Sequence, residues 1–106
     1  MSIGAPQYKD SRTKTDMDAT LTLVANDAYH QNLDANGSGR NVVLPAGDGT
    51  QGGRCMVTNL GGEALTVQQS DASTTVLVID ANEAAEVVCN GQSTTTGWQA
   101  VGITES

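Results

Sequence analysis

The feature that most constrains the fold is a succession of short β-prone runs, whose starts lie about 8–12 residues apart and which turn residues separate. In residues 20–24, polar and apolar side chains alternate, as a strand with one face on the core requires. The expected strands are residues 20–24, 28–33, 41–44, 55–60, 65–67, 76–79, 86–89 and 98–103. This pattern predicts an all-β domain, a compact sandwich or barrel-like fold of about eight short strands.

The chain lacks the patterns of helices and of membrane-spanning or exported segments. No segment keeps apolar residues at helical spacing over about ten positions. The longest aliphatic run, residues 76–79, is far shorter than the roughly 20 residues of a membrane-spanning helix. The first residues have neither the basic start nor the apolar stretch of a signal peptide. We therefore expect a protein made in the cytoplasm, without a membrane partner.

The beginning of the chain differs from the rest. Residues 1–19 are polar, contain Gly4 and Pro6, and show no apolar period. We expect a flexible, extended N-terminal arm over residues 1–19, followed by a single β domain over residues 20–106. The total of 106 residues suits one domain.

Charge is unevenly distributed between these two parts. The net charge is −7, yet residues 1–16 hold three cations, Lys9, Arg12 and Lys14, against two acids, so the other ninety residues carry −8. An acidic body repels phosphate backbones and anionic lipid surfaces. The sequence therefore predicts no nucleic-acid partner.

One segment resembles the opening of a calcium loop. Asp34, Asn36 and Ser38 supply oxygen ligands at alternate positions before Gly39, and Asp48 lies further along the chain. However, the twelfth position is Pro45, where a calcium loop needs a bidentate glutamate. We interpret the segment as an ordinary hairpin turn and predict no metal site.

No other pattern indicates catalysis or cofactor binding. His30 lies within an expected strand, without a serine or cysteine nucleophile signature nearby, and the glycine-rich loop at residues 46–53 lacks the lysine of a phosphate-binding loop. Cys55 and Cys89 are expected to be inert core thiols; a disulfide is the alternative. Trp98 is expected to fill the core, with an exposed sugar-stacking ring as the alternative. We therefore predict no catalytic residue, no cofactor and no enzymatic activity.

The core has little aromatic material, and two of its strands are apolar on both faces. Phe is absent, and there are only three aromatic residues. Val42-Val43-Leu44 and residues 76–79 carry apolar side chains at consecutive positions. Such a strand is covered on both sides, either by a second layer of the monomer or by a neighbouring subunit. We therefore expect a homo-oligomer.

A longer segment resembles known proteins. Residues 33–46, LDANGSGRNVVLPA, are similar to a segment that recurs in small virion proteins of tailed bacteriophages. Weaker similarity extends over about residues 30–103 and includes Val57-Thr58-Asn59, Leu65-Thr66-Val67, Asp80-Ala81-Asn82-Glu83, Asn90-Gly91 and Trp98. The resemblance implies a capsid decoration (cement) protein, a β-tulip-like unit that sits as a homotrimer on the outside of the capsid, in the virion.

Under that resemblance the partner is the major capsid protein lattice, and the chain is a structural protein that stabilises the capsid. A head-fibre or tail-associated β module with an adhesion role is an alternative, as is an unrelated binding domain or enzyme. The first twenty residues lie outside the resemblance. They hold three cations and two apolar anchors, which are the capsid-contact candidates: Ile3, Tyr8, Lys9, Arg12 and Lys14.

Overall fold

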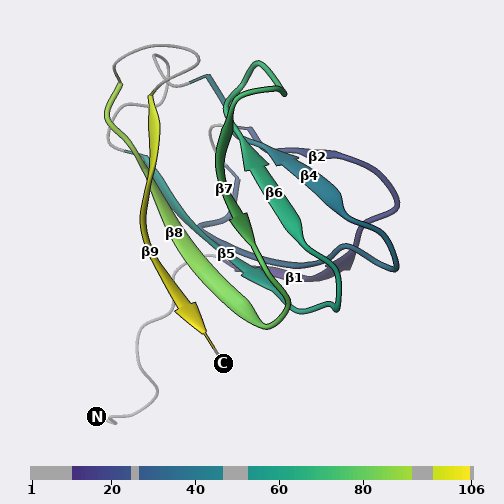
Figure 1. Cartoon of the computed structure of the whole chain (residues 1–106). Coiled ribbons are helices and arrows are strands. Elements are labelled where there is room, and N and C mark those ends of the chain that lie inside the picture. Colours follow the sequence, from purple (N-terminus) through teal and green to yellow (C-terminus); the bar gives the residue numbers. More distant parts are fainter. Residues whose placement is uncertain (1–10, 25–26, 47–52, 92–96, 106) are drawn as a thin grey trace, which may run out of the picture.

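The computed structural model describes residues 11–24, 27–46, 53–91 and 97–105 (Figure 1). These residues form nine strands and no helix, and hence no helix long and apolar enough to cross a membrane. The strands are β1 (Ser11–Asp16), β2 (Leu21–Thr22), β3 (His30–Asp34), β4 (Arg40–Val43), β5 (Arg54–Asn59), β6 (Leu65–Gln68), β7 (Thr75–Ile79), β8 (Glu83–Cys89) and β9 (Trp98–Glu105). The all-β prediction is confirmed, and each of the eight expected strands is present within a few residues of its expected position.

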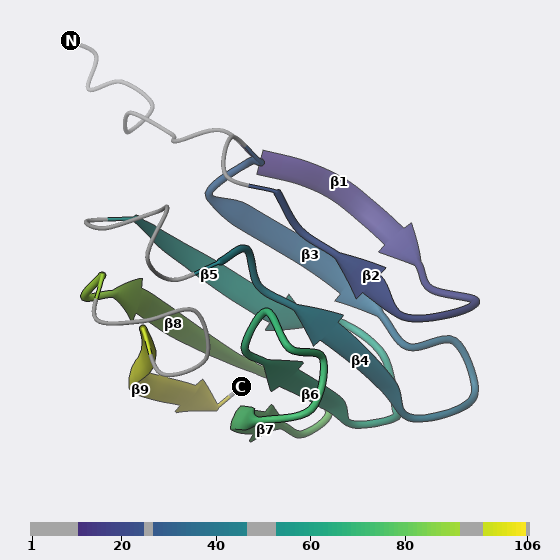
Figure 2. The same ribbon diagram turned by 90° about the horizontal axis from the view of Figure 1, so that it is seen from above.

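The strands form two sheets that pack face to face (Figure 2). Sheet A has the order β1-β3-β5-β8-β9, and sheet B has the order β2-β4-β6-β7. Neither sheet closes on itself. Of the two architectures that the sequence left open, the structure is therefore the sandwich.

The chain winds between the sheets along its first six strands. β1, β3 and β5 lie in sheet A and are parallel, while β2, β4 and β6 lie in sheet B and are parallel. β7, β8 and β9 complete the sheets with antiparallel pairings. Because β3 and β4 belong to different sheets, the hairpin predicted between them is wrong. Asn36 and Gly37, with φ of 62° and 89°, instead form a turn that crosses between the layers.

Alternation of side chains places the core between the sheets. In β5, Cys55, Val57 and Asn59 point inward, and in β8 the alternate residues do the same. The core consists mainly of small aliphatic side chains: Met17, Leu23, Leu33, Ala35, Val42, Leu44, Val57, Leu65, Val67, Ile79, Ala85 and Val87, together with Cys55, Cys89 and Trp98.

The two strands with apolar residues on both faces have different surroundings. In β4, Val43 is only 4% exposed although its inward-facing neighbour Val42 is also buried, so this strand is covered on both faces within the monomer. In β7, Ile79 is buried, but Val78 is 45% exposed. The monomer therefore leaves Val78 of β7 exposed, whereas Val76, two residues before it, is partly buried.

Part of the segment that was expected to be an arm forms a strand. Ser11–Asp16 form β1, which pairs in parallel with β3, and Met17 is buried in the core. This edge strand is held by main-chain pairing, and its sequence, SRTKTD, has no apolar alternation to reveal it. Of the capsid-contact candidates, Arg12 and Lys14 lie on β1, and Ile3, Tyr8 and Lys9 are outside the described residues.

Candidate functional site

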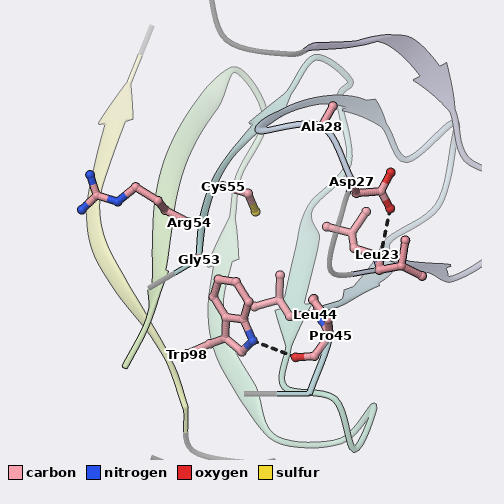
Figure 3. Close-up of a pocket in the computed structure, with 10 residues that line it drawn as sticks. Leu23, Asp27, Ala28, Leu44, Pro45, Gly53, Arg54, Cys55 and Trp98 are labelled. Carbon is pink, nitrogen blue, oxygen red and sulfur yellow. Dashed lines mark hydrogen bonds between the residues drawn. The ribbon is translucent and has the colours of Figure 1, made fainter. Parts of the chain in front are cut away.

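A small pocket lies at the end of the sandwich where β2 and β4 end and β3, β5 and β9 begin (Figure 3). Its volume is about 70 Å³, and its walls include Leu23, Leu44, Cys55 and Trp98. Asp27 also lines it, while the side chain of Arg54 points away from the Trp98 ring. A space of this size and lining accepts a small apolar group rather than a charged substrate.

Trp98 is a fixed wall of this pocket. It is 5% exposed, and its indole N–H donates a hydrogen bond to the carbonyl of Pro45 at 2.8 Å. The buried Gln69 amide binds the backbone of the same residue: its Nε2 donates to the Trp98 carbonyl at 2.9 Å, and its Oε1 accepts from the Trp98 N–H at 3.2 Å. The prediction that Trp98 fills the core is confirmed.

The two cysteines are free and buried, as predicted. Burial, with a smaller contribution from the carboxylates of Glu86 and Asp27, raises the pKa of the Cys55 thiol to about 12. A thiol with such a pKa is protonated at neutral pH and is a poor nucleophile. Cys55 therefore contributes apolar surface to the pocket rather than reactivity.

A polar cluster spans the outer face of sheet A. The Tyr29 hydroxyl donates a short hydrogen bond to Oε2 of Glu86, and the Arg54 guanidinium lies 4.0 Å from that oxygen. The hydrogen bond to Glu86, with burial and the charge of Glu86, raises the pKa of Tyr29. His30 packs edge-on against the Tyr29 ring at 4.6 Å. The cluster joins β5, β8 and the start of β3, so its evident role is to brace the sheet.

In the segment that resembles a calcium loop, Asp34 and Asn36 make hydrogen bonds to other groups of the protein. Oδ1 of Asp34 accepts the N–H of Asn36 at 2.8 Å, and the Asn36 side chain donates to Asp18 at 3.0 Å. Ser38 is exposed, and Asp48 lies outside the described residues. Within the part of the chain that the structure describes, no three His, Cys, Asp or Glu residues gather as metal ligands. The absence of a metal stays a prediction.

Sequence reasoning missed a set of polar side chains that connect the two sheets. Asn59 of β5 is fully buried, and its Nδ2 donates to the carbonyls of Glu63 at 2.7 Å and of Ile79 in β7 at 2.9 Å. Arg40, at the start of β4, donates from Nε to the carbonyls of Met17 and Ala35, which follow β1 and β3.

Asn59 left a signal in the sequence that points to this role. It occupies the third inward position of β5, after Cys55 and Val57, and a polar residue at an inward position needs buried hydrogen-bond partners. Gln69 and Arg40 carry no such signal in the sequence. Their hydrogen bonds join parts of the two sheets, and the sequence does not reveal how the strands of those sheets are ordered.

Comparisons with protein-family models, with curated proteins and with solved structures find no match for this chain. The geometry is thus the basis for assigning a role. It offers a sandwich in which the buried side chains of Asn59 and Gln69 bind the chain's own backbone, a small apolar pocket, and an excess of acidic residues.

Proposed function

We propose that the chain is a non-enzymatic structural protein of a phage virion, which binds the outside of the capsid and stabilises it as a decoration (cement) protein. The proposal depends on residues 33–46, whose sequence resembles phage virion proteins, and on the structure that these residues form. They form the end of β3, the left-handed turn at Asn36 and Gly37, and the buried strand β4. The resemblance therefore covers one continuous unit of the frame, and we extend it to a β-tulip-like trimer.

The use of the buried polar groups supports a structural rather than a catalytic role. Catalytic groups need partners among side chains or substrates, whereas the buried Asn59 and Gln69 and the half-buried Arg40 bind main-chain groups across the sandwich. Such bonds stiffen a sandwich whose core contains a single tryptophan and no phenylalanine. A stiff, acidic, stable unit suits a protein that coats an assembly.

The proposed partner is the major capsid protein lattice, and the proposed contacts are Ile3, Tyr8, Lys9, Arg12 and Lys14. Three of these residues are cations beside a body that carries −8. A protein that binds only the assembled lattice stabilises it by RT ln(1 + [L]/Kd) at every site, so no chemical step is needed.

Co-sedimentation with capsids tests the proposal. The full chain is mixed with expanded heads assembled from a phage major capsid protein, and with unexpanded shells. We expect saturable binding to expanded heads and a higher temperature of head rupture. A chain that does not sediment with either form contradicts the proposal, and binding to host cells alone would favour a head-fibre or tail-associated module.

A truncated chain locates the contact. Removal of residues 1–10 takes away Ile3, Tyr8 and Lys9, and we expect it to weaken capsid binding while the sandwich stays folded. The control is Asp71→Asn, which changes one charge on the exposed turn between β6 and β7. Equal binding of the truncated and full chains would place the contact in the body instead.

A further inference from the structure

Two turns of the protein share a sequence pattern and a backbone conformation. Residues 33–36, LDAN, lead from β3 towards β4, and residues 79–82, IDAN, lead from β7 towards β8. The asparagines that end these segments are exposed, and both have a left-handed φ, which is 62° at Asn36 and 64° at Asn82. The two asparagines can therefore be compared directly, and what differs between them is the residue that follows.

The backbone amide that follows Asn36 is open to solvent. Gly37 is exposed at a φ of 89°, and a Cβ at its position would meet nothing within 4 Å. None of the described residues accepts a hydrogen bond from the Gly37 N–H. After Asn82, by contrast, the Glu83 N–H donates to the carbonyl of Asp80 at 3.1 Å, and the Glu83 side chain accepts from the Asp80 N–H at 3.0 Å. Glu83 thus closes its turn with two hydrogen bonds that Gly37 does not make.

The side chain of Asn36 is held by its nitrogen, and its carbonyl group takes no part in the bonds. The turn after β3 lies beside the turn after β1 (Figure 2), where Nδ2 of Asn36 donates to Oδ1 of Asp18 at 3.0 Å. The backbone N–H of Asn36 donates to Oδ1 of Asp34 at 2.8 Å. The electrophilic Cγ of the amide and the backbone nitrogen of Gly37 are four covalent bonds apart, so a bond between them closes a five-membered ring.

We propose that Asn36 is a site of spontaneous deamidation and isomerisation, with the Gly37 nitrogen as the nucleophile. Hydroxide takes the proton of the Gly37 N–H, the nitrogen bonds to Cγ of Asn36, and the Cγ–Nδ2 bond breaks. Nδ2 leaves as ammonia with a proton from water, and the product is a cyclic imide. Water then opens the ring, either at Cγ to give an aspartate or at the main-chain carbonyl carbon to give an isoaspartate. The sum is one water consumed and one ammonia released, without any change of oxidation state.

The modification alters the turn that carries the chain from sheet A to sheet B. Both products remove the donor that Asp18 binds and add a negative charge beside Asp18 and Asp34, in a chain that already carries −7. Like charges at such short range repel one another. Isoaspartate also lengthens the main chain by a methylene group just before the buried strand β4. We therefore expect the converted protein to unfold at a lower urea concentration. The reaction does not require the chain to belong to a virion.

Peptide mapping of the folded, full-length protein tests this site. The protein is incubated at mildly alkaline pH, where hydroxide is more abundant, and an unincubated sample gives the background of the digestion. Cleavage with trypsin places Asn36 in residues 15–40 and Asn82 in residues 55–106, and fragmentation locates each converted asparagine. We expect conversion at Asn36 to be more than an order of magnitude faster than at Asn82, and to yield both aspartate and isoaspartate.

Matched variants separate the ring closure from other causes of acid formation. Asn36→Gln lengthens the side chain, so that the same attack must close a less favourable six-membered ring, and residues 15–40 should then keep their mass. Asn82→Gln is the control and should convert at position 36 as fast as the wild type. Circular dichroism verifies that both variants are folded.

A synthetic peptide of residues 31–41 gives the rate without the fold, and needs no variant. We expect the folded protein to react within one order of magnitude of the peptide. If residues 15–40 keep their mass while the peptide is converted, the turn protects Asn36 and the inference is overturned. Equal rates at Asn36 and Asn82 overturn it as well, and so does conversion confined to Asn90, which precedes Gly91 in the other Asn-Gly pair.

Discussion

Substitution of Asn59 by alanine should be among the most destabilising single changes in this protein. The side chain is fully buried and makes three hydrogen bonds: two donated to the carbonyls of Glu63 and Ile79, and one accepted from the N–H of Gly61 at 3.0 Å. A buried hydrogen bond contributes about 1 kcal/mol, and an acceptor left without a partner costs more, so we expect a loss of about 3–4 kcal/mol. That is a large part of the roughly 5–15 kcal/mol that stabilises a domain.

Urea unfolding followed by tryptophan fluorescence measures this loss. Trp98 is the only tryptophan and is buried, so its emission reports the opening of the sandwich. With a urea dependence of about 1–3 kcal/mol per molar, the midpoint should fall by about 1–4 M. Asn59→Asp keeps the shape and the acceptor but removes both donors, and should also be strongly destabilised.

The control is Asn41→Ala, in a half-buried position of β4 on the outer face of sheet B, where we expect a change of about 0.5 kcal/mol. If Asn59→Ala costs no more than Asn41→Ala, the bonds of Asn59 between the sheets do not stabilise the fold, and the reasoning is refuted.

Two further predictions concern close packing and alkaline pH. Alanine at Gly61 would overlap the Asp34 carboxylate and should cost about 1–3 kcal/mol, whereas Gly62→Ala meets nothing within 4 Å and should be near neutral; equal urea midpoints would contradict this. Because the pKa of Cys55 rises from 9.0 in the unfolded chain to about 12 in the folded protein, its contribution to stability is complete below pH 9 and falls as pH rises toward 12, by about 1.4 kcal/mol per unit. Cys55→Ala should therefore flatten the decline of stability with pH, and an unchanged slope would exclude the thiol as its cause.

The strands were predictable because their local signals are strong. Residues 20–24 alternate in polarity, and β4 and β7 contain most of the apolar runs 42–44 and 76–79. Burial of both cysteines followed from their position in apolar strand-like runs, and burial of Trp98 followed from its being the largest side chain of an aromatic-poor domain. These properties depend on near neighbours in the chain, which the sequence displays directly.

Strand order and the bonds between sheets were not predictable in the same way. A turn with Asn-Gly is typical of a hairpin, but here it crosses from sheet A to sheet B, because β4 pairs with β2 and β6 rather than with β3. β1 was missed because main-chain pairing with β3 fixes it without an apolar face. The role of Arg40 depends on the carbonyls of Met17 and Ala35, which only the folded chain places together.

The proposed trimer and the proposed capsid contacts have a joint test. An oligomer binds the lattice through several weak contacts at once, and such multivalency strengthens binding by about 10²–10⁴ without any new contact. Removal of residues 1–10 takes Ile3, Tyr8 and Lys9 from every copy at once. It should therefore weaken co-sedimentation with heads by about a hundredfold and leave the mass of the oligomer, measured by light scattering, unchanged. If the full chain sediments with heads although light scattering gives 10.9 kDa, avidity does not contribute, and each copy must bind the lattice on its own.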